Sequence, residues 1–308
     1  MITGENIRTL GIVGTGAIGA SWAALALGRG LDVVAWDPAG GAEERLRTDV
    51  TTLLGDDSPA GGGLRFAGGL GETAGEADMV IESGPERLDT KREIFAALDA
   101  AAAPGVLLAS SSSGLMPSSF QDACAYYPER VLVTHPFNPP HLVPLVEVVG
   151  GQRTSEEAVE AAMATMRHLG KKPIRIHQEV PGHVANRLQA ALWREAYSLV
   201  DRGIVSVADI DTAIANGPGL RWSLLGPFAT QHVSGGPGGL RHVLEHLGPP
   251  MVEWWETLGR PELTPELVER LVTGTDQELD GTDVTDLVAR RDRALRQLME
   301  LKTEFDLD

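Results

Sequence analysis

The sequence contains one cysteine and no long apolar run, and each of these absences excludes a class of protein. A single cysteine, Cys124, cannot form an intramolecular disulfide and is typical of a reducing compartment, so we expect a cytoplasmic location. No apolar run approaches the roughly 20 residues that a membrane-spanning helix needs. Residues 1–16 also lack the basic and apolar regions of a signal peptide. We therefore expect no association with a membrane.

Lysine is scarce as well, and positive charge is outweighed by negative charge. The 26 Lys and Arg residues stand against 43 Asp and Glu residues, which gives a formal net charge of −17. Such a charge repels polyanions at long range, so nucleic acid is not an expected partner.

The first half of the sequence alternates short aliphatic runs with helical patterns, which is typical of parallel strands joined by crossover helices. The runs are nearly continuous in apolar character, as expected for a sheet covered on both faces. The expected strands lie within residues 9–16, 31–37, 77–84, 105–113, 130–136, 143–151 and 173–177. The sequence therefore predicts the α/β class, with a Rossmann-type doubly wound sheet.

Helical patterns separate these strands and then replace them. A helix is expected over residues 154–173, where Thr154 and Glu157 have the spacing of a capping box. Residues 55–75 are expected to form a loop with at most one short strand. After Pro181 and Gly182 the pattern is helical only, so we expect one domain over 1–182 and a smaller all-helical domain over 183–308.

A glycine-rich turn after the first expected strand indicates a dinucleotide site. Gly14, Gly16 and Gly19 form G-x-G-x-x-G, with Ala17 and Ile18 between the last two glycines, and Asp37 ends the next strand. The glycines allow a close approach of a pyrophosphate to a helix N-terminus, and Asp37 would accept hydrogen bonds from the adenine ribose. Because Asp37 would repel a 2′-phosphate, NAD is expected rather than NADP. A glycine-rich turn without a ligand is the alternative, which this context disfavours.

A histidine and a glutamate occupy two neighbouring expected strands. His135 ends one of them, where open α/β sheets bind ligands, and Glu147 lies on the next. A carboxylate on one imidazole nitrogen makes the other nitrogen a suitable base for an alcohol proton. From the pair alone, a proton-transfer role and a buried structural pair remain equally open.

Four segments add to this pair: PERLDTKREIF, SSSSGLMPSS, HPFNPP and PGHVANRL. With these segments, the sequence resembles the 3-hydroxyacyl-CoA dehydrogenases over almost its whole length. It implies that His135 is the catalytic base, that Glu147 is its partner, and that Ser113 and Asn186 contact the substrate oxygen. No covalent role is expected for the serine, because SSSSG is not a nucleophile elbow.

The same resemblance implies further roles. Glu86 and Lys91 match positions near the nicotinamide half of NAD, and the helical domain is expected to form a homodimer. A structural or NAD(H)-sensing protein that has kept this fold is the rival interpretation. The four catalytic residue types argue against that rival.

Two departures from the acyl-CoA enzymes point to another branch of the family. The segment between Asp37 and Asp78 is short, rich in glycine and free of lysine, which argues against a CoA thioester. Arg221, in GPGLRWSLLGPF, would hold a free carboxylate as a bidentate partner, although a surface or interface arginine is the alternative. The sequence is similar to the branch of L-gulonate 3-dehydrogenase, lambda-crystallin and L-carnitine dehydrogenase.

This branch predicts a small hydroxycarboxylate substrate, with L-carnitine first and L-gulonate or another 3-hydroxy acid next. A trimethylammonium group binds aromatic faces, although the same rings more often lie in cores or dimer contacts. The candidates are Phe137, Trp222, Phe228, Trp254 and Trp255. No metal is expected, because His242 and His246 lack an evident third ligand.

Overall fold

The structure is a computed structural model that describes residues 7–55 and 62–307. The start of the chain, on which the expectation of no signal peptide depends, lies partly outside these residues, as does part of the 55–75 segment. The chain divides into two compact units, Met1–Arg187 and Leu188–Asp308. The domain boundary predicted near Gly182 is not tested by this division and stays a prediction. Each unit is described by itself below.

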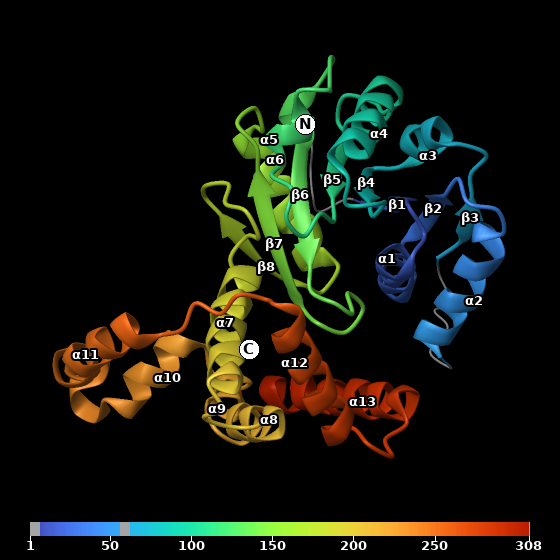
Figure 1. The fold of residues 1–308 in the computed structure, drawn as a ribbon. Helices are drawn as coiled ribbons and strands as arrows, with labels where there is room; N and C mark the ends of the chain where they lie inside the picture. The colour runs from blue at the N-terminus through green and yellow to red at the C-terminus, as the bar shows by residue number, and fades with distance from the viewer. Residues whose placement is uncertain (1–6, 56–61, 308) are drawn as a thin grey trace. The chain divides into compact units, whose positions relative to one another are not determined.

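The first unit is built on an eight-stranded sheet in the order β3-β2-β1-β4-β5-β6-β7-β8 (Figure 1). All neighbouring strands pair in parallel except β6 and β7, which are antiparallel. This arrangement confirms the expected α/β class with a Rossmann-type sheet. The strands are β1 Thr9–Val13, β2 Asp32–Trp36, β3 Leu64–Phe66, β4 Met79–Glu82, β5 Leu107–Ser110, β6 Val131–Pro136, β7 Leu145–Gly150 and β8 Lys172–Ile176.

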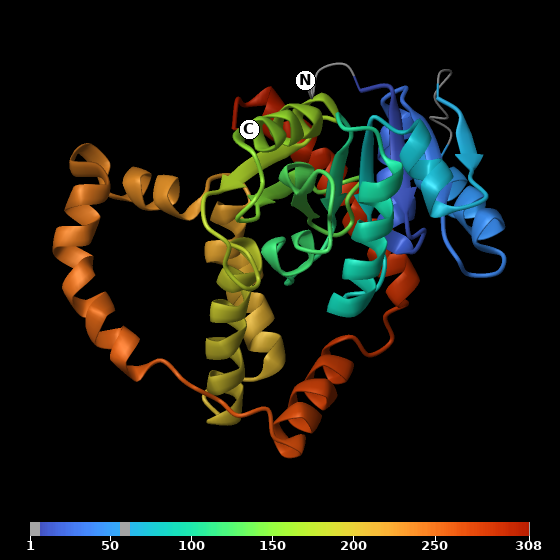
Figure 2. The same ribbon diagram turned by 90° about the horizontal axis from the view of Figure 1, so that it is seen from above.

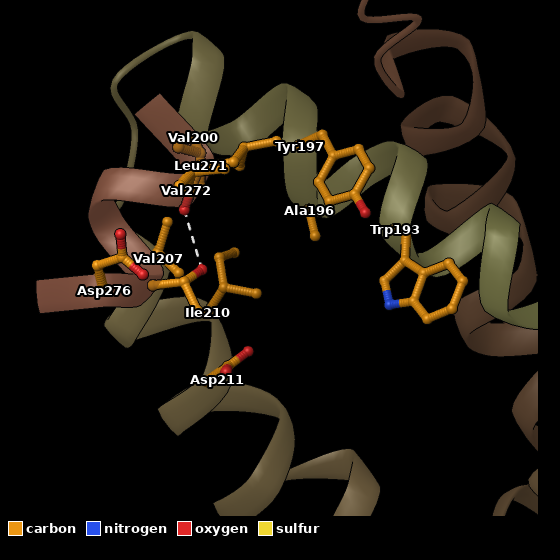
Figure 3. A pocket seen from close by; sticks show the side chains of 11 residues that line it. Trp193, Ala196, Tyr197, Val200, Val207, Ile210, Asp211, Leu271, Val272 and Asp276 are labelled. Atoms are coloured by element: carbon orange, nitrogen blue, oxygen red, sulfur yellow. Dashed lines mark hydrogen bonds between the residues drawn. The ribbon is translucent and has the colours of Figure 1, made fainter. Parts of the chain in front are cut away.

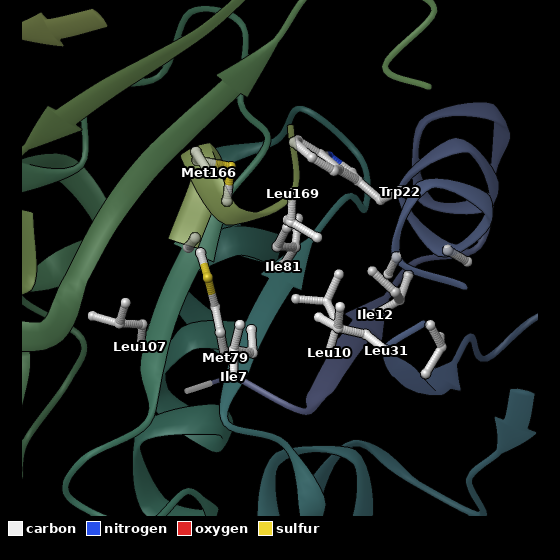
Figure 4. Packing of buried hydrophobic residues seen from close by; sticks show 14 of the residues in the cluster. Ile7, Leu10, Ile12, Trp22, Leu31, Met79, Ile81, Leu107, Met166 and Leu169 are labelled. Atoms are coloured by element: carbon white, nitrogen blue, oxygen red, sulfur yellow. The ribbon is translucent and has the colours of Figure 1, made fainter. Parts of the chain in front are cut away.

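Helices cover the sheet and bury apolar side chains on both of its faces. The helices of this unit are α1 Ala17–Gly28, α2 Ala42–Leu54, α3 Leu70–Glu76, α4 Leu88–Ala101, α5 Ser118–Gln121, the 3-10 turn η1 Pro128–Arg130, and α6 Glu156–His168. Leu107 of β5 packs in one core cluster with α1, α2 and α6, whereas its neighbour Leu108 packs in the other with α3 and α4. In Figure 4, Trp22 of α1 and Leu169, just after α6, lie among the side chains of the first cluster. The alternation of side chains along a strand explains why both faces are apolar.

Two local expectations are corrected, and one helix was not predicted. Residues 70–76 form the helix α3 where only a loop or short strand was expected, and Glu72 there pairs with Arg65 of β3. The helix α2 was not anticipated either. The cap of α6 is Ser155, whose side chain accepts from the backbone N–H of Ala158, so the Thr154–Glu157 capping box is wrong. Thr154 instead donates to the carbonyl of Val131.

The second unit is helical. It contains most of α7 Ala185–Asp201, then α8 Val207–Asn216, α9 Pro218–Trp222, α10 Pro227–Ser234, the 3-10 turn η2 Gly236–Gly238, α11 Gly239–Thr257, α12 Pro265–Glu278 and α13 Val284–Glu304. Within it, α8 packs against α9 and α12, and α10 packs against α11. Figure 2 shows the extended segment, residues 258–264, that joins α11 to α12. Among the described residues, no helix combines the length and the apolar character needed to cross a membrane.

Candidate active site

The antiparallel pair of β6 and β7 brings His135 and Glu147 face to face. The two residues are direct partners in the strand register. Their side chains meet, with 2.8 Å between Nδ1 of His135 and Oε2 of Glu147. Both are buried: His135 is 4% exposed and Glu147 is 0% exposed. The antiparallel turn-back therefore pairs two residues that are twelve positions apart in the chain.

Hydrogen bonds keep Glu147 ionised in this buried position. Its second oxygen, Oε1, accepts from the backbone N–H groups of Val184 and Ala185, each at 2.9 Å. Burial by itself raises the pKa of Glu147, but the hydrogen bonds from His135, Ala185 and Val184 outweigh it and lower the pKa below its ordinary value. Because an ionised carboxylate only accepts, the shared proton is on Nδ1 of His135. The lone pair of the imidazole is then on Nε2, where it can take a proton.

Ser113 and Asn186 lie together at the edge of the same site. Ser113 is exposed just beyond the end of β5, and Asn186 is in the first turn of α7. The amide Nδ2 of Asn186 donates to the backbone carbonyl of Ser113 at 3.2 Å. The side chain of Asn186 is thereby oriented, and its second amide hydrogen remains for another acceptor.

The glycine-rich turn has the geometry that a dinucleotide needs. Gly14 has φ +88°, and a Cβ there would lie 2.8 Å from the backbone of Ser83 and Gly84. A Cβ on Gly19 would lie 1.9 Å from the carbonyl oxygen of Gly14, so only glycine allows α1 to approach β1 this closely. A Cβ on Gly16 would meet no heavy atom within 4 Å. That open space lies directly at the N-terminus of α1, which is where the sequence predicts that the pyrophosphate of NAD binds.

Asp37 is held at the end of β2 by two backbone donors. Its Oδ2 accepts from the N–H of Thr15, and its Oδ1 accepts from the N–H of Ala39, both at 2.8 Å. The carboxylate is therefore fixed beside the glycine-rich turn with lone pairs to spare for ribose hydroxyls. Ala17 and Ile18 form the first residues of α1.

Lys91 and Glu86 are close in space but differ in their surroundings. Lys91 is 1% exposed, and its Nζ donates to both carboxylate oxygens of Glu82 and to the carbonyl of Gly84. All three ammonium hydrogens of Lys91 are therefore engaged by acceptors at the end of β4 and in the loop that follows it. Sequence reasoning missed Glu82, although an acidic residue at the end of the apolar run MVIE was a signal.

Glu86 is partly exposed and faces the turn after β5. Its Oε1 accepts from the hydroxyl of Ser112 and from the N–H groups of Gly114 and Leu115. Burial raises the pKa of Glu86, but the Ser112 bond, the charge of Lys91 and these backbone donors lower it overall. The nicotinamide roles of Glu86 and Lys91 stay predictions.

Arg221 belongs to the second unit and is exposed on the short helix α9. His135 and Glu147 belong to the first unit, whereas Arg221 belongs to the second. The proposed contact of Arg221 with a substrate carboxylate therefore stays a prediction. Among the aromatic candidates, Phe137 is beside the base: its ring centroid is 5.5 Å from that of His135, in an edge-on arrangement. Trp254 and Trp255 are exposed on α11.

A separate pocket of about 430 Å³ lies between α7, α8 and α12 of the second unit. Figure 3 shows Trp193 and Tyr197 of α7 along it, with Asp211 of α8 and Asp276 of α12. Its lining contains none of the site residues predicted from the sequence. The pocket is therefore not assigned to the reaction.

A Rossmann-type sheet, a glycine-rich turn at a helix N-terminus and an acidic residue after β2 are together the features of a dinucleotide-binding domain. The family model described as "3-hydroxyacyl-CoA dehydrogenase, NAD binding domain" matches residues 9–180, and that of the C-terminal domain matches residues 182–274. Together these models span most of the chain. The chain belongs to the 3-hydroxyacyl-CoA dehydrogenase family.

Relatives within this family are similar over nearly the full length. The chain is 48% identical to the L-carnitine dehydrogenase of Pseudomonas aeruginosa, with 94% of this chain and 92% of that protein covered. It is 46% identical to the L-carnitine dehydrogenase of Streptomyces coelicolor, with 97% and 96% covered. A solved structure of 5-formyl-3-hydroxy-2-methylpyridine 4-carboxylic acid 5-dehydrogenase is 30% identical, with a TM-score of 0.83 and 96% and 99% covered. The chain is therefore an NAD-dependent 3-hydroxy acid dehydrogenase.

Proposed function

We propose that the chain oxidises the 3-hydroxyl group of L-carnitine to the corresponding 3-oxo acid. The observation that carries this proposal is the buried hydrogen bond between His135 and Glu147, which leaves Nε2 free to act as a base. The names of the full-length relatives support carnitine as the substrate. L-Gulonate or another 3-hydroxy acid is the second candidate.

The residues of the site divide the chemistry between them. Nε2 of His135 takes the proton of the 3-hydroxyl, and Glu147 stabilises the resulting imidazolium. Ser113 and Asn186 are neutral donors that suit an oxygen which changes from alcohol to carbonyl. When bound, NAD would accept the hydrogen on C3 as hydride. Phe137, whose ring is 5.5 Å from that of His135, can offer an aromatic face to the trimethylammonium group.

A panel of substrates tests the proposed function directly. NADH formation would be followed at 340 nm with L-carnitine, L-gulonate, 3-hydroxybutyrate and 3-hydroxybutyryl-CoA. We expect the highest kcat/KM with L-carnitine. A preference for the thioester would contradict the proposal, and no turnover with any compound would favour a structural or NAD(H)-sensing protein.

Arg221 is proposed to bind the free carboxylate of the substrate. We expect Arg221→Met to raise the KM for L-carnitine by about 10- to 100-fold, because a charged hydrogen-bond pair is lost, and to leave the KM for NAD unchanged. Arg260→Met removes another exposed arginine of the second unit and is the matched control. Equal KM values for the two variants would mean that another residue holds the carboxylate.

We also propose that two copies of the chain pair through the second unit. This unit exposes large apolar side chains, including Phe228 at 74%, Trp254 at 61% and Trp255 at 62%. Exposed apolar surface of this kind is typical of a subunit interface. The cytoplasmic location stays a prediction from composition.

A further inference from the structure

A second histidine, His183, lies beside the proposed base His135, although the sequence alone predicts no role for it. It is fully buried, at 0% exposure, in the turn between β8 and α7. Its ring centroid is 5.2 Å from that of His135, with 42° between the ring planes. Its Nε2 is 3.2 Å from the backbone carbonyl oxygen of Ser112.

The bonding of this ring defines its tautomer. A backbone carbonyl only accepts hydrogen bonds, so Nε2 of His183 carries the hydrogen and Nδ1 holds a lone pair. Nδ1 is buried and has no hydrogen-bond partner among residues 7–55 and 62–307. Burial lowers the pKa of His183, and the neighbouring His135 lowers it further, whereas the Ser112 carbonyl, Glu147 and Glu86 only partly oppose this. The ring is therefore neutral near pH 7.

Packing alone does not account for a histidine at this position. A buried acceptor without a donor is destabilising, and an apolar ring of similar size would avoid that cost. His183 also has φ +52°, a left-handed conformation that non-glycine residues rarely adopt. Two unfavourable features at one residue beside the base indicate a role in the reaction.

The backbone that follows His183 connects the two halves of the site. The N–H groups of Val184 and Ala185 hold Glu147, and the amide of Asn186 holds the carbonyl of Ser113. The ring of His183 donates a hydrogen bond to the carbonyl of Ser112, the residue before Ser113. Residues 183–186 thus bind both the partner of the base and the turn that carries Ser113.

We propose that His183 is a positioning residue for His135, which packs against the base and fixes it relative to the Ser113 turn through the bond to the Ser112 carbonyl. This inference rests on the proposed function of His135 as the base. The uncharged imidazole is more polar than a hydrocarbon ring, so it also helps to solvate the imidazolium that forms on His135. Glu147 and Glu86 are the carboxylates that face this pair of rings.

The test compares two substitutions of His183 with L-carnitine and NAD as substrates. His183→Phe keeps a planar ring but loses the donor, and His183→Asn keeps a donor and tolerates the left-handed φ. We expect His183→Phe to lower kcat by about 10-fold or more and to leave NADH affinity within about 2-fold. The acid limb of its kcat/KM profile should move to lower pH, because an apolar ring disfavours the imidazolium. We expect His183→Asn to recover part of kcat.

The control is His177→Phe, which replaces an exposed histidine six residues earlier and should change neither kcat nor the pH profile. Wild-type kcat and an unmoved acid limb in folded His183→Phe would overturn the proposal. If His183→Phe does not fold, His183→Ala, which loses both the ring and the donor, takes its place, and wild-type kcat with an unmoved acid limb in that variant would overturn the proposal.

A second measurement does not depend on the substrate. Long-range ¹H–¹⁵N spectra of the histidine rings in wild-type protein should show His183 as the neutral Nε2–H tautomer at pH 7. A charged ring, or the Nδ1–H tautomer, would overturn the proposal. Failure of all substrates in the panel would instead contradict the proposed function, while the spectra would still test the state of His183.

Discussion

At the scale of single residues, the proposed role of His135 as a base depends on a carboxylate, Glu147, that stays ionised without access to water. Glu147 is 0% exposed, and its three hydrogen bonds come from His135 and two backbone N–H groups. A buried carboxylate is stable only with such donors. The two backbone donors are Val184, just before α7, and Ala185, its first residue, so the ionisation of Glu147 depends on how this helix begins.

The first prediction concerns the base itself. We expect His135→Gln to lower kcat by about two to four orders of magnitude, because glutamine can donate to Glu147 but cannot take the alcohol proton. The affinity for NADH, measured by fluorescence titration, should stay nearly unchanged. His141→Gln, in the loop after β6, is the control for a histidine outside the proton transfer. Undiminished turnover in His135→Gln would remove this residue from the mechanism.

Lys171 supports the loop that follows the base. It is 5% exposed, and its Nζ donates to the carbonyls of Pro140 and Val143 and lies 5.4 Å from the ring of Trp22. Burial lowers the pKa of Lys171 to about 8. Nothing in the sequence around Lys171 indicates that its ammonium group is buried.

The second prediction follows from that pKa. Between about pH 8 and 10.5 the unfolded chain holds the Lys171 proton more strongly than the folded chain, so this group makes the fold more stable as pH rises. We expect the free energy of unfolding of wild type minus that of Lys171→Met to increase by up to about 3 kcal/mol across this range. The hydrogen bonds to the carbonyls of Pro140 and Val143 stabilise the charged form of Lys171 and so oppose the lowering of its pKa. The value of about 3 kcal/mol is therefore an upper limit for the increase.

Urea unfolding at several pH values would measure this difference. Lys172→Met removes the adjacent, exposed lysine and should show no such increase. Parallel pH curves for wild type and Lys171→Met would contradict the prediction.

At the scale of elements, the turn from β1 to α1 needs glycine for two different reasons. Gly16 leaves space for a ligand, and Gly19 allows the close packing of α1 on β1. Gly16 has φ −67°, which alanine also adopts, and open space around its Cβ position. We expect Gly16→Ala to keep the wild-type unfolding temperature and to raise the KM for NAD by about 10-fold or more, because the methyl group occupies the pyrophosphate space.

The matched variant is Gly19→Ala, whose methyl group would meet the Gly14 carbonyl at 1.9 Å. It should destabilise the fold by about 1–3 kcal/mol. Thermal unfolding and NAD kinetics of both variants measure the two effects. A lower unfolding temperature in Gly16→Ala than in Gly19→Ala would refute this division of roles.

The elements also show what could be predicted from the sequence. The strands were predictable because their apolar runs are buried on both faces, and the glycine turn because its spacing serves one ligand geometry. The helix α3 was missed, because residues 70–76 contain two glycines and little periodicity and the helix packs on β1 and β2. His183 was missed because its importance comes from contacts with Ser112 and His135, which are far away in the chain.

At the scale of the whole molecule, the two units differ in how they bury apolar side chains. The first unit has two core clusters, one on each face of its sheet. The second unit exposes many large apolar residues. Among its described residues only five side chains are buried, three of them apolar and two polar: Val200, Val243, Leu267, Ser198 and Thr230. A helical unit with so small a core gains stability when a second copy covers its surface.

The last prediction tests this pairing. We expect wild-type protein to have twice the chain mass of 32.8 kDa in light scattering after gel filtration, and an unfolding temperature that rises with protein concentration. The double variant Trp254→Glu and Trp255→Glu places two charges on an exposed face of α11 and should shift the mass to that of one chain. Tyr126→Glu changes a comparably exposed aromatic residue of the first unit, at 66%, and should leave the mass unchanged. A wild-type mass of one chain at all concentrations would refute pairing, and a double variant that keeps the double mass would exclude this face of α11 from the interface.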